Sequence, residues 1–369
     1  MLEYIAPAKN KKEINYFAEI YLPSSSAYSI HVMKMCDTLA NAGLKVNLIV
    51  FGKSNKIDIF KYYNCKSRFN IINYNIKKNN FLGRVSFAFK AILKYKNKKN
   101  ELILSRSIIT GLFLSFISKN VTIEMHHELR GFTKIFAYLI KNSHYFRTIK
   151  FIFITKYLSK DFLYKDIKSI ILDDGVELND FLNFPKQKNY KRTCVYTGSF
   201  TKGKGVENII KIAGYAKNTT FHLYGDLLNS SYRKKDFKNN IVYKGYVKYH
   251  EIPKILKRYQ VVLMPYSDKV YVRSKNLETS KYMSPLKLFE YMASNRVIVA
   301  KYLNVYSHIL NNKNSILINS NCPRLWASRI NTVFNNIKKY QRFAKKAFKD
   351  VRKYTWEIRV NKLLSFINT

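Results

Sequence analysis

The chain has 369 residues, enough for two packed cores, and its 47% content of hydrophobic residues argues against general disorder. Lysine and arginine outnumber aspartate and glutamate by 66 to 23, which gives a formal net charge of +43. Such a charge indicates an anionic partner, either nucleic acid or an anionic membrane surface. The abundance of Lys, Asn, Ile, Tyr and Phe is also typical of proteins from AT-rich genomes, so mutational drift is an alternative source of part of the charge.

The N-terminal segment MLEYIAPAKNKK lacks the apolar core of a signal peptide. The apolar run at residues 108–117 is about half as long as a membrane span. Four cysteines lie far apart with no CxxC pair, which argues against a structural zinc site and for a reducing compartment. These cysteines are Cys36, Cys65, Cys194 and Cys322. We therefore expect a cytoplasmic protein that is not integral to the membrane.

Residues 14–52 read as a strand, a Ser-rich loop, a helix that ends near Gly43, and a second strand. Short buried strands separated by helical stretches are expected next, at 101–105, 121–125 and 151–155. This alternation is typical of α/β proteins with parallel sheets.

Two basic stretches rich in aromatic residues, 79–100 and 130–150, lie between these strands. The first places Phe81 and Phe89 on one helical stripe, together with Val85 and Ile92. The basic residues beside this stripe are Arg84, Lys90, Lys94 and Lys96. Such a face suits an interfacial contact with anionic lipid, and the alternative is a sheet-covering helix with a Lys-rich polar face. Nucleic acid is not expected, because no aromatic sheet face or reading helix is evident.

His126 and His127 follow the predicted strand 121–125, within EMHHELRG. They are candidates for a site at the end of that strand. The alternative is a pair of polar loop residues before the next helix, with Glu128 as a capping partner. Residues 178–192 are polar, carry Pro185, and read as a linker.

A second strand–loop–helix–strand unit begins at residue 193, and its loop YTGSFTKGKG spans residues 196–205. This loop is one residue short of a Walker A motif, since Gly205 stands where Ser or Thr would bind magnesium. No Walker B strand ending in Asp follows, because the strand at 261–267 ends in Pro-Tyr-Ser. A P-loop is therefore disfavoured. Further strands are expected at 241–247, 296–302 and 315–319.

The segment SPLKLFEYMASNRVIVA, residues 284–300, predicts a helix followed directly by a strand. We expect Ser284 to cap the helix, with Pro285 at its first position and Lys287 adding charge to an anion-binding N-terminus. Glu290 should point toward the ribose of a bound nucleotide. The alternative is an ordinary amphipathic helix. A basic helical tail that includes Trp356 extends from Arg324.

These elements predict two Rossmann-like, doubly wound α/β domains that face each other across a cleft. The expected boundaries are 1–182 for the first domain and 183–350 for the second. Residues 351–369 are expected to form a helix that returns to the first domain.

Taken in order, four segments resemble family-four retaining glycosyltransferases of the GT-B fold. Residues 284–300 resemble the donor-site signature, and 196–210 resemble the loop that opens the second domain. Residues 171–181 are similar to the interdomain turn, and 21–50 to the first βαβ unit. The resemblance covers nearly the whole chain. It implies transfer, with retention, from a UDP- or GDP-linked sugar to a growing, lipid-linked surface glycan, without a cofactor or metal.

The resemblance also implies roles for single residues. His126 approaches the donor sugar, Lys204 neutralises the diphosphate and Glu290 binds the ribose, and these three are the expected catalytic residues. The donor-binding set is Ser199, Lys204, Gly225, Val247, Ser284, Pro285, Leu286, Lys287 and Glu290. The basic residues Arg84, Lys90, Lys94 and Lys96 mark the acceptor and membrane side. We expect a bacterial enzyme of capsule or lipopolysaccharide synthesis, peripheral to the inner face of the cell membrane.

Two positions depart from the family pattern. Ser199 stands where the family has Arg, with Lys202 as a candidate replacement, and Tyr282 stands where the first Glu of the signature is expected. These departures leave open a non-catalytic basic protein that binds membrane or RNA and has a decayed transferase fold. A nucleotide-sugar epimerase of the same build is a third alternative, although the acidic residues it needs around the sugar are scarce.

Overall fold

We analysed a computed structural model that describes residues 12–368 except 98–100, 163, 165, 183–189, 229 and 273–276. The chain divides into two compact units: unit 1 comprises Met1–Leu172 and Val360–Thr369, and unit 2 comprises Asp173–Arg359. The boundaries expected from the sequence lay at 182/183 and 350/351. Within the linker expected at 178–192, residues 183–189 fall outside the described residues, and Asn179–Leu182 form a short helix, α8.

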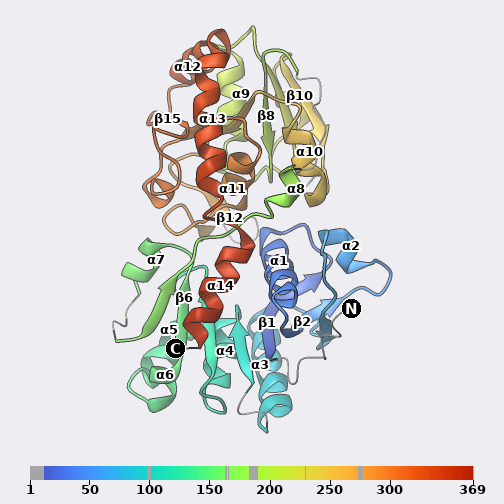
Figure 1. The fold of residues 1–369 in the computed structure, drawn as a ribbon, viewed down its shortest axis with the longest axis vertical. Coiled ribbons are helices and arrows are strands. Elements are labelled where there is room, and N and C mark those ends of the chain that lie inside the picture. Colours follow the sequence, from blue (N-terminus) through green and yellow to red (C-terminus); the bar gives the residue numbers. More distant parts are fainter. Residues whose placement is uncertain are drawn as a thin grey trace, which may run out of the picture. The chain divides into compact units, whose positions relative to one another are not determined.

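Unit 1 contains a sheet of seven parallel strands in the order β3-β2-β1-β4-β5-β6-β7 (Figure 1). The order reverses between β1 and β4, and ligands bind at such switch points in open α/β sheets, beyond the carboxyl ends of the strands. The strands are β1 (Glu13–Leu22), β2 (Lys45–Lys53), β3 (Asn70–Asn73), β4 (Leu102–Ser105), β5 (Val121–Met125), β6 (Lys150–Phe153) and β7 (Lys168–Ile171).

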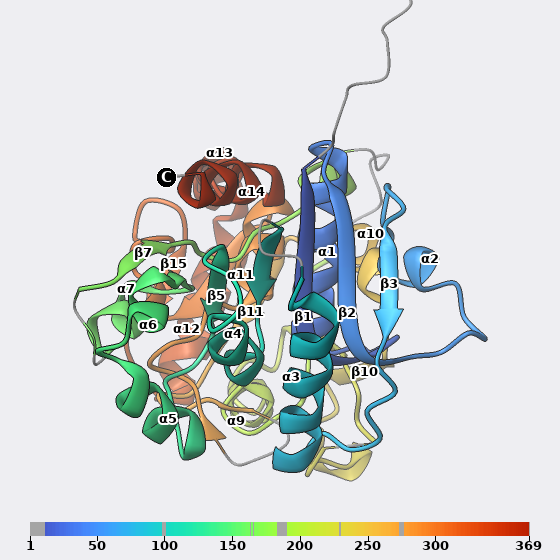
Figure 2. The same ribbon diagram turned by 90° about the horizontal axis from the view of Figure 1, so that it is seen from below.

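Helices connect the strands of unit 1, and α3, α4, α5 and α6 contact one another in sequence order (Figure 2). The central strands are buried almost throughout, because hydrophobic residues follow one another along them. The helices are α1 (Ala27–Asn41), α2 (Ile59–Tyr63), α3 (Phe81–Tyr95), α4 (Ile108–Leu114), α5 (Phe132–Ile140), α6 (His144–Thr148) and α7 (Lys156–Lys160).

Unit 2 contains a second parallel sheet of six strands, in the order β10-β9-β8-β11-β14-β15. Its order reverses between β8 and β11. The strands are β8 (Thr193–Thr197), β9 (Thr220–Tyr224), β10 (Ile241–Gly245), β11 (Val261–Met264), β14 (Val297–Lys301) and β15 (Ile316–Ile318). A small antiparallel pair, β12 (Tyr271–Val272) and β13 (Leu277–Glu278), lies outside this sheet.

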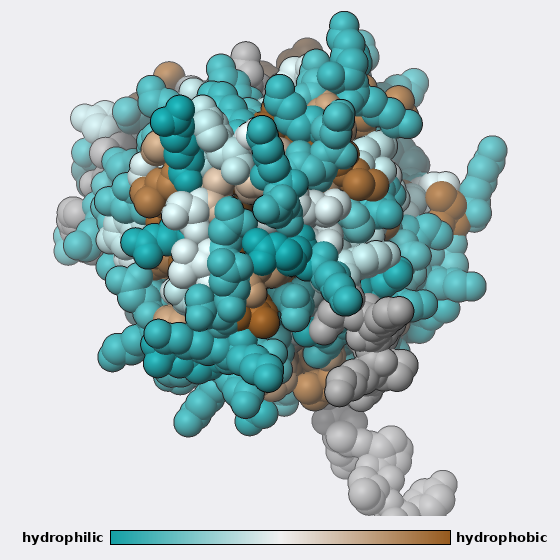
Figure 3. Space-filling model, turned by 90° about the horizontal axis from the view of Figure 1, so that it is seen from above, coloured by the Kyte–Doolittle hydropathy of each residue, from teal (hydrophilic) through white to brown (hydrophobic). Residues whose placement is uncertain are grey.

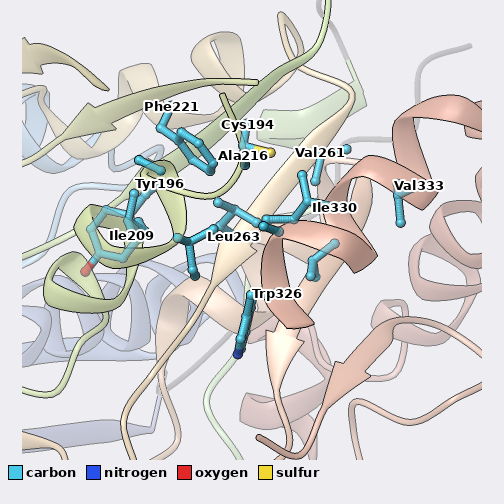
Figure 4. Packing of buried hydrophobic residues seen from close by; sticks show 14 of the residues in the cluster. Cys194, Tyr196, Ile209, Ala216, Phe221, Val261, Leu263, Trp326, Ile330 and Val333 are labelled. Atoms are coloured by element: carbon cyan, nitrogen blue, oxygen red, sulfur yellow. The ribbon is translucent and has the colours of Figure 1, made fainter. Parts of the chain in front are cut away.

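The helices of unit 2 are α8 (Asn179–Leu182), α9 (Val206–Ala213), α10 (Ile252–Leu256), α11 (Leu286–Ala293), α12 (Pro323–Asn335) and α13 (Ile337–Val351), with short 3₁₀ turns η1 (Lys234–Asp236), η2 (Tyr249–Glu251) and η3 (Asn304–Tyr306). The face of the molecule in Figure 3 carries mostly hydrophilic residues, with hydrophobic ones scattered among them, as on an ordinary solvated surface. Beneath the surface, α9 and α12 pack against β8, β9 and β11, with Tyr196, Leu263 and Trp326 in the core (Figure 4).

The last helix, α14 (Trp356–Ile367), begins in unit 2, and residues 360–369 belong to unit 1. Lys150 anchors its end by donating a hydrogen bond from Nζ to the Ile367 carbonyl at 2.6 Å. The two parallel sheets, and the last helix with its final residues in unit 1, confirm the predicted α/β fold. All four cysteines are free. No helix in the described part of the chain combines the length and apolar character that a membrane span needs.

Candidate functional site

The loop of residues 198–205 joins β8 to α9 at the carboxyl edge of the unit 2 sheet, where the strand order reverses. Glu207, in the first turn of α9, holds this loop in place. Its Oε1 accepts from the Gly203 N–H at 2.9 Å and from the Ser267 hydroxyl at 3.0 Å. Its Oε2 accepts from the Tyr232 hydroxyl at 2.7 Å. Glu207, which orders the loop that carries Lys204, was not predicted from the sequence.

Gly203 is required by the conformation of this loop. Its φ is +81°, and a Cβ at this position would lie 2.0 Å from the carbonyl oxygen of Lys269. Any other residue would therefore be strained and would collide with the neighbouring backbone.

Two of the lysine side chains at this loop, Lys204 and Lys287, are at least partly buried. Lys204 is half-buried, and burial lowers its pKa. Lys287 is only 8% exposed, and its Nζ lies 3.6 Å from the ring centroid of Tyr196 without a hydrogen-bond partner among the described residues. Burial, with the positive charge of Lys204, holds the pKa of Lys287 well below its usual range. A buried ammonium group without a partner is costly, so this arrangement indicates a site that binds an anion.

Gly198 and Gly225 bring the backbones of two strand ends together beside Lys287. A Cβ on Gly225 would lie 2.2 Å from the Gly198 carbonyl oxygen, and a Cβ on Gly198 would lie 2.8 Å from Lys287 Nζ. Because Gly198 has no side chain, the Lys287 ammonium can lie against its backbone, and because Gly225 has none, the two strand ends can approach each other. The structure thus brings the predicted residue Gly225 next to the 198–205 loop.

The start of α11 differs from the prediction. The helix begins at Leu286 with Pro285 as its N-cap, so the prediction that Ser284 caps it is wrong. The reason is that the Ser284 hydroxyl has another role, since its oxygen accepts a hydrogen bond from the Asp174 N–H at 3.0 Å. Lys287 still lies in the first turn, where backbone N–H groups have no acceptor within the helix and favour a negative charge.

Glu290 lies one turn further along α11 and is 5% exposed. Burial raises the pKa of its carboxyl to about 7, although the Lys287 charge and a hydrogen bond with Tyr249 act in the opposite direction. Tyr249 belongs to η2, shortly after the half-buried Val247. Tyr249 was not identified from the sequence, and it connects Glu290 to the segment that follows β10.

Ser199 and Tyr282, the two positions that depart from the family pattern, have defined surroundings in the structure. Ser199 accepts a hydrogen bond at its Oγ from the Thr201 hydroxyl, at 3.2 Å. Lys202, the candidate for the missing charge, is exposed, and its Nζ lies 5.3 Å from the centroid of the Tyr271 ring. Lys287, by contrast, is buried beside this loop. Tyr282 is a buried aromatic residue, 8% exposed.

In unit 1, His126 lies directly after β5 in a buried polar network. Its Nδ1 lies 3.0 Å from Arg106 Nη2, and its Nε2 lies 3.2 Å from Glu124 Oε1. His31 Nε2 lies 2.9 Å from the same carboxylate oxygen, and the Tyr16 hydroxyl donates to Glu124 Oε2 at 2.6 Å. Burial, together with the Arg106 charge, lowers the pKa of His126 to about 3.

Within the described residues, His31, Glu124 and His126 place three possible metal ligand atoms within 4.8 Å of one another. Their surroundings do not fit a metal ion, because Arg106 presents a positive charge to the His126 ring and Tyr16 already donates to the carboxylate. The close contacts of Glu124 with the two histidines, together with those of Arg106 and Tyr16, account for the cluster.

The alternates to His126 make separate contacts. His127 is exposed, with its Nδ1 2.8 Å from the Glu128 carbonyl oxygen. Glu128 pairs with Arg130 at 2.6 Å. Of the two candidate histidines, His126 is thus the one that belongs to the buried polar network at the end of β5.

The four basic residues expected on the acceptor side lie on or directly after α3, but three of them have partners. Arg84 pairs with Glu19 at 3.0 Å, and Lys90 donates to the Tyr74 carbonyl at 2.8 Å. Lys94 Nζ lies 5.8 Å from the Tyr74 ring, and Lys96 is exposed at the C-cap of α3.

Comparison with known proteins relates unit 2 to a family. Residues 191–336 match the family model described as "Glycosyl transferases group 1". An uncharacterised 41.2 kDa protein in the cps region of Klebsiella pneumoniae is 29% identical over 210 residues, which is 54% of each chain. The match therefore spans about half the length of this curated relative.

Solved structures share the fold of the whole chain. A glycosyltransferase from Rickettsia africae aligns with a TM-score of 0.75 at 12% identity, over 98% of both chains. Anabaena Alr3699/HepE, crystallised with UDP and glucose, aligns with a TM-score of 0.70 at 12% identity, over 97% of this chain and 99% of that one. The protein thus has the GT-B fold of these glycosyltransferases.

Proposed function

We propose that the protein is a glycosyltransferase that uses a nucleoside diphosphate sugar as its donor. The observation that carries this proposal is the buried Lys287 ammonium, which has no hydrogen-bond partner among the described residues and lies at the loop that carries Lys204. Two cations at the carboxyl edge of a doubly wound sheet suit a diphosphate. The family match of residues 191–336 and the fold shared with a UDP-bound structure support the same donor class.

In the proposed reaction the bond between the sugar C1 and the β-phosphate oxygen breaks, and the nucleoside diphosphate leaves with the electron pair. An acceptor hydroxyl attacks C1 from the same face, and its proton passes to the departing phosphate, so configuration is retained. Lys204 and Lys287 stabilise the charge that develops on the leaving group. Two lysines can supply this charge without a divalent metal. Glu290 is proposed to bind the ribose hydroxyls of a uridine or guanosine nucleotide.

The proposed acceptor is a growing surface polysaccharide carried on a lipid. Support comes from the Klebsiella relative, whose name places it in a cps region. A lipid-linked acceptor would require the protein to work at the cytoplasmic face of the cell membrane, and unit 1 offers a surface suited to that location.

This surface, which we term the aromatic patch, lies on helices α3 to α6. The inner face of α3 packs through Phe87, Ala88, Ala91 and Tyr95, which are buried. Phe81 and Phe89 of the predicted stripe are therefore not sheet-covering residues. In α5 only Ala137 is buried. The patch consists of the exposed residues Phe81, Leu82, Phe89, Leu93, Phe116, Phe132, Ile135, Tyr138, Leu139 and Tyr145.

Ring contacts join these helices into one surface. Phe81 packs against Phe132 with ring centroids 5.1 Å apart, and Phe116 packs against Tyr145 at 5.0 Å. Lys96 and Lys134 are exposed near this surface. A continuous apolar patch flanked by cations is typical of proteins that insert into the interface of an anionic bilayer.

The proposal is tested by incubating the protein with a panel of UDP- and GDP-linked sugars, with and without chelator and a lipid-linked oligosaccharide acceptor. We expect one donor to release nucleoside diphosphate, and the release to be faster with acceptor and unaffected by chelator. Sugar isomerisation without release would indicate the epimerase instead. Absence of turnover and of any ligand-induced thermal stabilisation across the panel would favour the decayed fold.

A further inference from the structure

Arg106 and His126 are the first residues after the neighbouring parallel strands β4 and β5, at the carboxyl edge of the unit 1 sheet. Arg106 is held on two sides. Its backbone N–H donates to the Phe17 carbonyl at 2.9 Å, and its guanidinium lies 4.0 Å from the ring centroid of Tyr28. The guanidinium therefore presents a fixed set of donors to the His126 ring.

The contact between these side chains determines where His126 carries its hydrogen. A guanidinium group has donors and no acceptor, so Nδ1 of His126, 3.0 Å from Nη2 of Arg106, must accept. The hydrogen of the neutral ring is then on Nε2, which faces Glu124 Oε1 at 3.2 Å. A carboxylate only accepts, so both neighbours of the ring select the same tautomer.

The charged and titratable groups around the ring come from three elements. They are Arg106 after β4, Glu124 of β5 and His31 of α1. Glu124 is shared, because His31 Nε2 and the Tyr16 hydroxyl also face its oxygens. Protonation of Nδ1 would place two donors and two positive charges face to face at the 3.0 Å contact.

We propose that Arg106 is a positioning residue that holds His126 uncharged, with its hydrogen on Nε2, and thereby prevents His126 from acting as an acid or base. This role rests on the proposed function, since it leaves the donor phosphate as the group that takes the acceptor proton. His126 then contributes a ring of fixed orientation and no charge at the carboxyl edge of the unit 1 sheet.

The test uses the full-length chain with ¹⁵N-labelled histidine. Long-range ¹H–¹⁵N spectra between pH 5 and 8 report the tautomer and ionisation of each ring, and the His126 signals are assigned by their loss in His126→Asn. In the parent protein we expect His126 to carry its hydrogen on Nε2 and to stay uncharged throughout. In Arg106→Ala the pKa of His126 should rise by at least about 2 units, so that the ring titrates within this range.

Three variants complete the experiment. Arg68→Ala removes an exposed arginine of unit 1 that pairs with Asp58 and should leave the His126 signals unchanged. Arg106→Lys keeps the charge and should keep His126 from titrating. If Arg106→Ala does not fold, Arg106→Gln replaces it, with the same upward shift expected because the charge is lost.

The proposal is overturned if His126 of the parent carries its hydrogen on Nδ1 or titrates between pH 5 and 8. It is also overturned if the variants that lose the charge, Arg106→Ala or Arg106→Gln, leave the titration of His126 unchanged. The spectra need no substrate, so this outcome is independent of whether the protein transfers a sugar. Where transfer is measured, the pH–rate profile should gain a histidine ionisation only in Arg106→Ala.

Discussion

At the scale of single residues, burial of the Lys287 ammonium lowers the folding stability of the ligand-free protein. Its ammonium is 8% exposed and, within the described residues, is accompanied by the Tyr196 ring rather than by a hydrogen-bond acceptor. A cation–π contact offsets only part of the desolvation of a buried charge. A side chain kept at such a cost is typical of a binding site.

Replacing Lys287 with Met, which has a similar length and no charge, should therefore stabilise the ligand-free protein. We expect the free energy of unfolding to increase by about 1–3 kcal/mol, the cost of an unsatisfied buried polar group. Urea denaturation measures this change. Lys202→Met is the matched control from the same loop, and it should have little effect because Lys202 is exposed. A destabilised Lys287→Met protein would contradict the assignment of an unpartnered charge.

The raised pKa of Glu290 predicts that the stability of the protein depends on pH. Its pKa is about 7 in the folded protein and 4.5 without the fold, so the folded state holds the proton more tightly. This contribution to stability is complete below pH 4.5 and is lost as the pH rises to about 7. Between pH 5 and 8, the free energy of unfolding of the parent should fall by up to about 3 kcal/mol relative to that of Glu290→Gln. Parallel pH profiles for the two proteins would show that the carboxyl is ionised in the fold.

At the scale of elements, the strands were predictable because a short continuous apolar run between polar segments is buried most readily as a strand. Contacts between loops that are distant in sequence were not predictable. Glu207 reaches Gly203, Ser267 and Tyr232 through a fold that no local pattern reveals. The Ser284 cap was predicted incorrectly for the same reason, since the residue that uses its hydroxyl, Asp174, is distant in sequence.

The sequence predicted an apolar stripe on α3 that includes Phe81 and Phe89, but it could not say which apolar residues of the helix face the sheet. The helix has two apolar faces: Phe87 and Tyr95 pack inward, whereas Phe81 and Phe89 stay exposed. For the predicted donor residues, Lys204, Gly225 and Lys287 meet at one loop because strand order places the ends of β8 and β9 next to each other.

The 198–205 loop provides a prediction for an element. Gly203→Ala should cost about 1–3 kcal/mol in backbone strain and move Lys204, because the new Cβ would meet the Lys269 carbonyl. Thermal denaturation with and without UDP should show both a lower midpoint and a smaller shift on ligand addition. Gly214→Ala is the control, since Gly214 has a helical conformation at the end of α9 and an alanine there should be tolerated. Equal behaviour of the two variants would mean that the loop conformation is not needed for binding.

At the scale of the whole molecule, the net charge of +43 does not by itself identify a membrane-binding side. Helix α13 of unit 2 exposes cations without exposed large apolar residues: Lys338, Lys339, Arg342, Lys345, Lys346 and Lys349. The aromatic patch of unit 1 is the surface where exposed apolar residues gather. We therefore expect apolar insertion at this patch to add to a general electrostatic attraction.

Replacing Leu93, Ile135 and Leu139 of the patch with Ser should weaken binding to anionic vesicles at least about tenfold, because inserted apolar side chains each contribute more than about 1 kcal/mol. The loss should persist at high salt, which screens only the contribution of the cations. Vesicle flotation measures both. Leu228→Ser, a change at a 94% exposed position of unit 2, is the control. Unchanged flotation of the triple variant would remove the membrane from the proposal and make a soluble acceptor the better hypothesis.

Binding of a nucleoside diphosphate to unit 2 through Lys204 and Lys287 is the central prediction for this protein. Calorimetric titration of the full-length protein with UDP and GDP tests this claim most directly. We predict one-site binding of at least one of the two, in the presence of chelator, and a loss of about 1.5–3 kcal/mol of binding free energy in Lys204→Ala and in Lys287→Met, with Lys202→Met unchanged. Parent-like binding by both lysine variants, or no binding of either nucleotide to the parent, would contradict it.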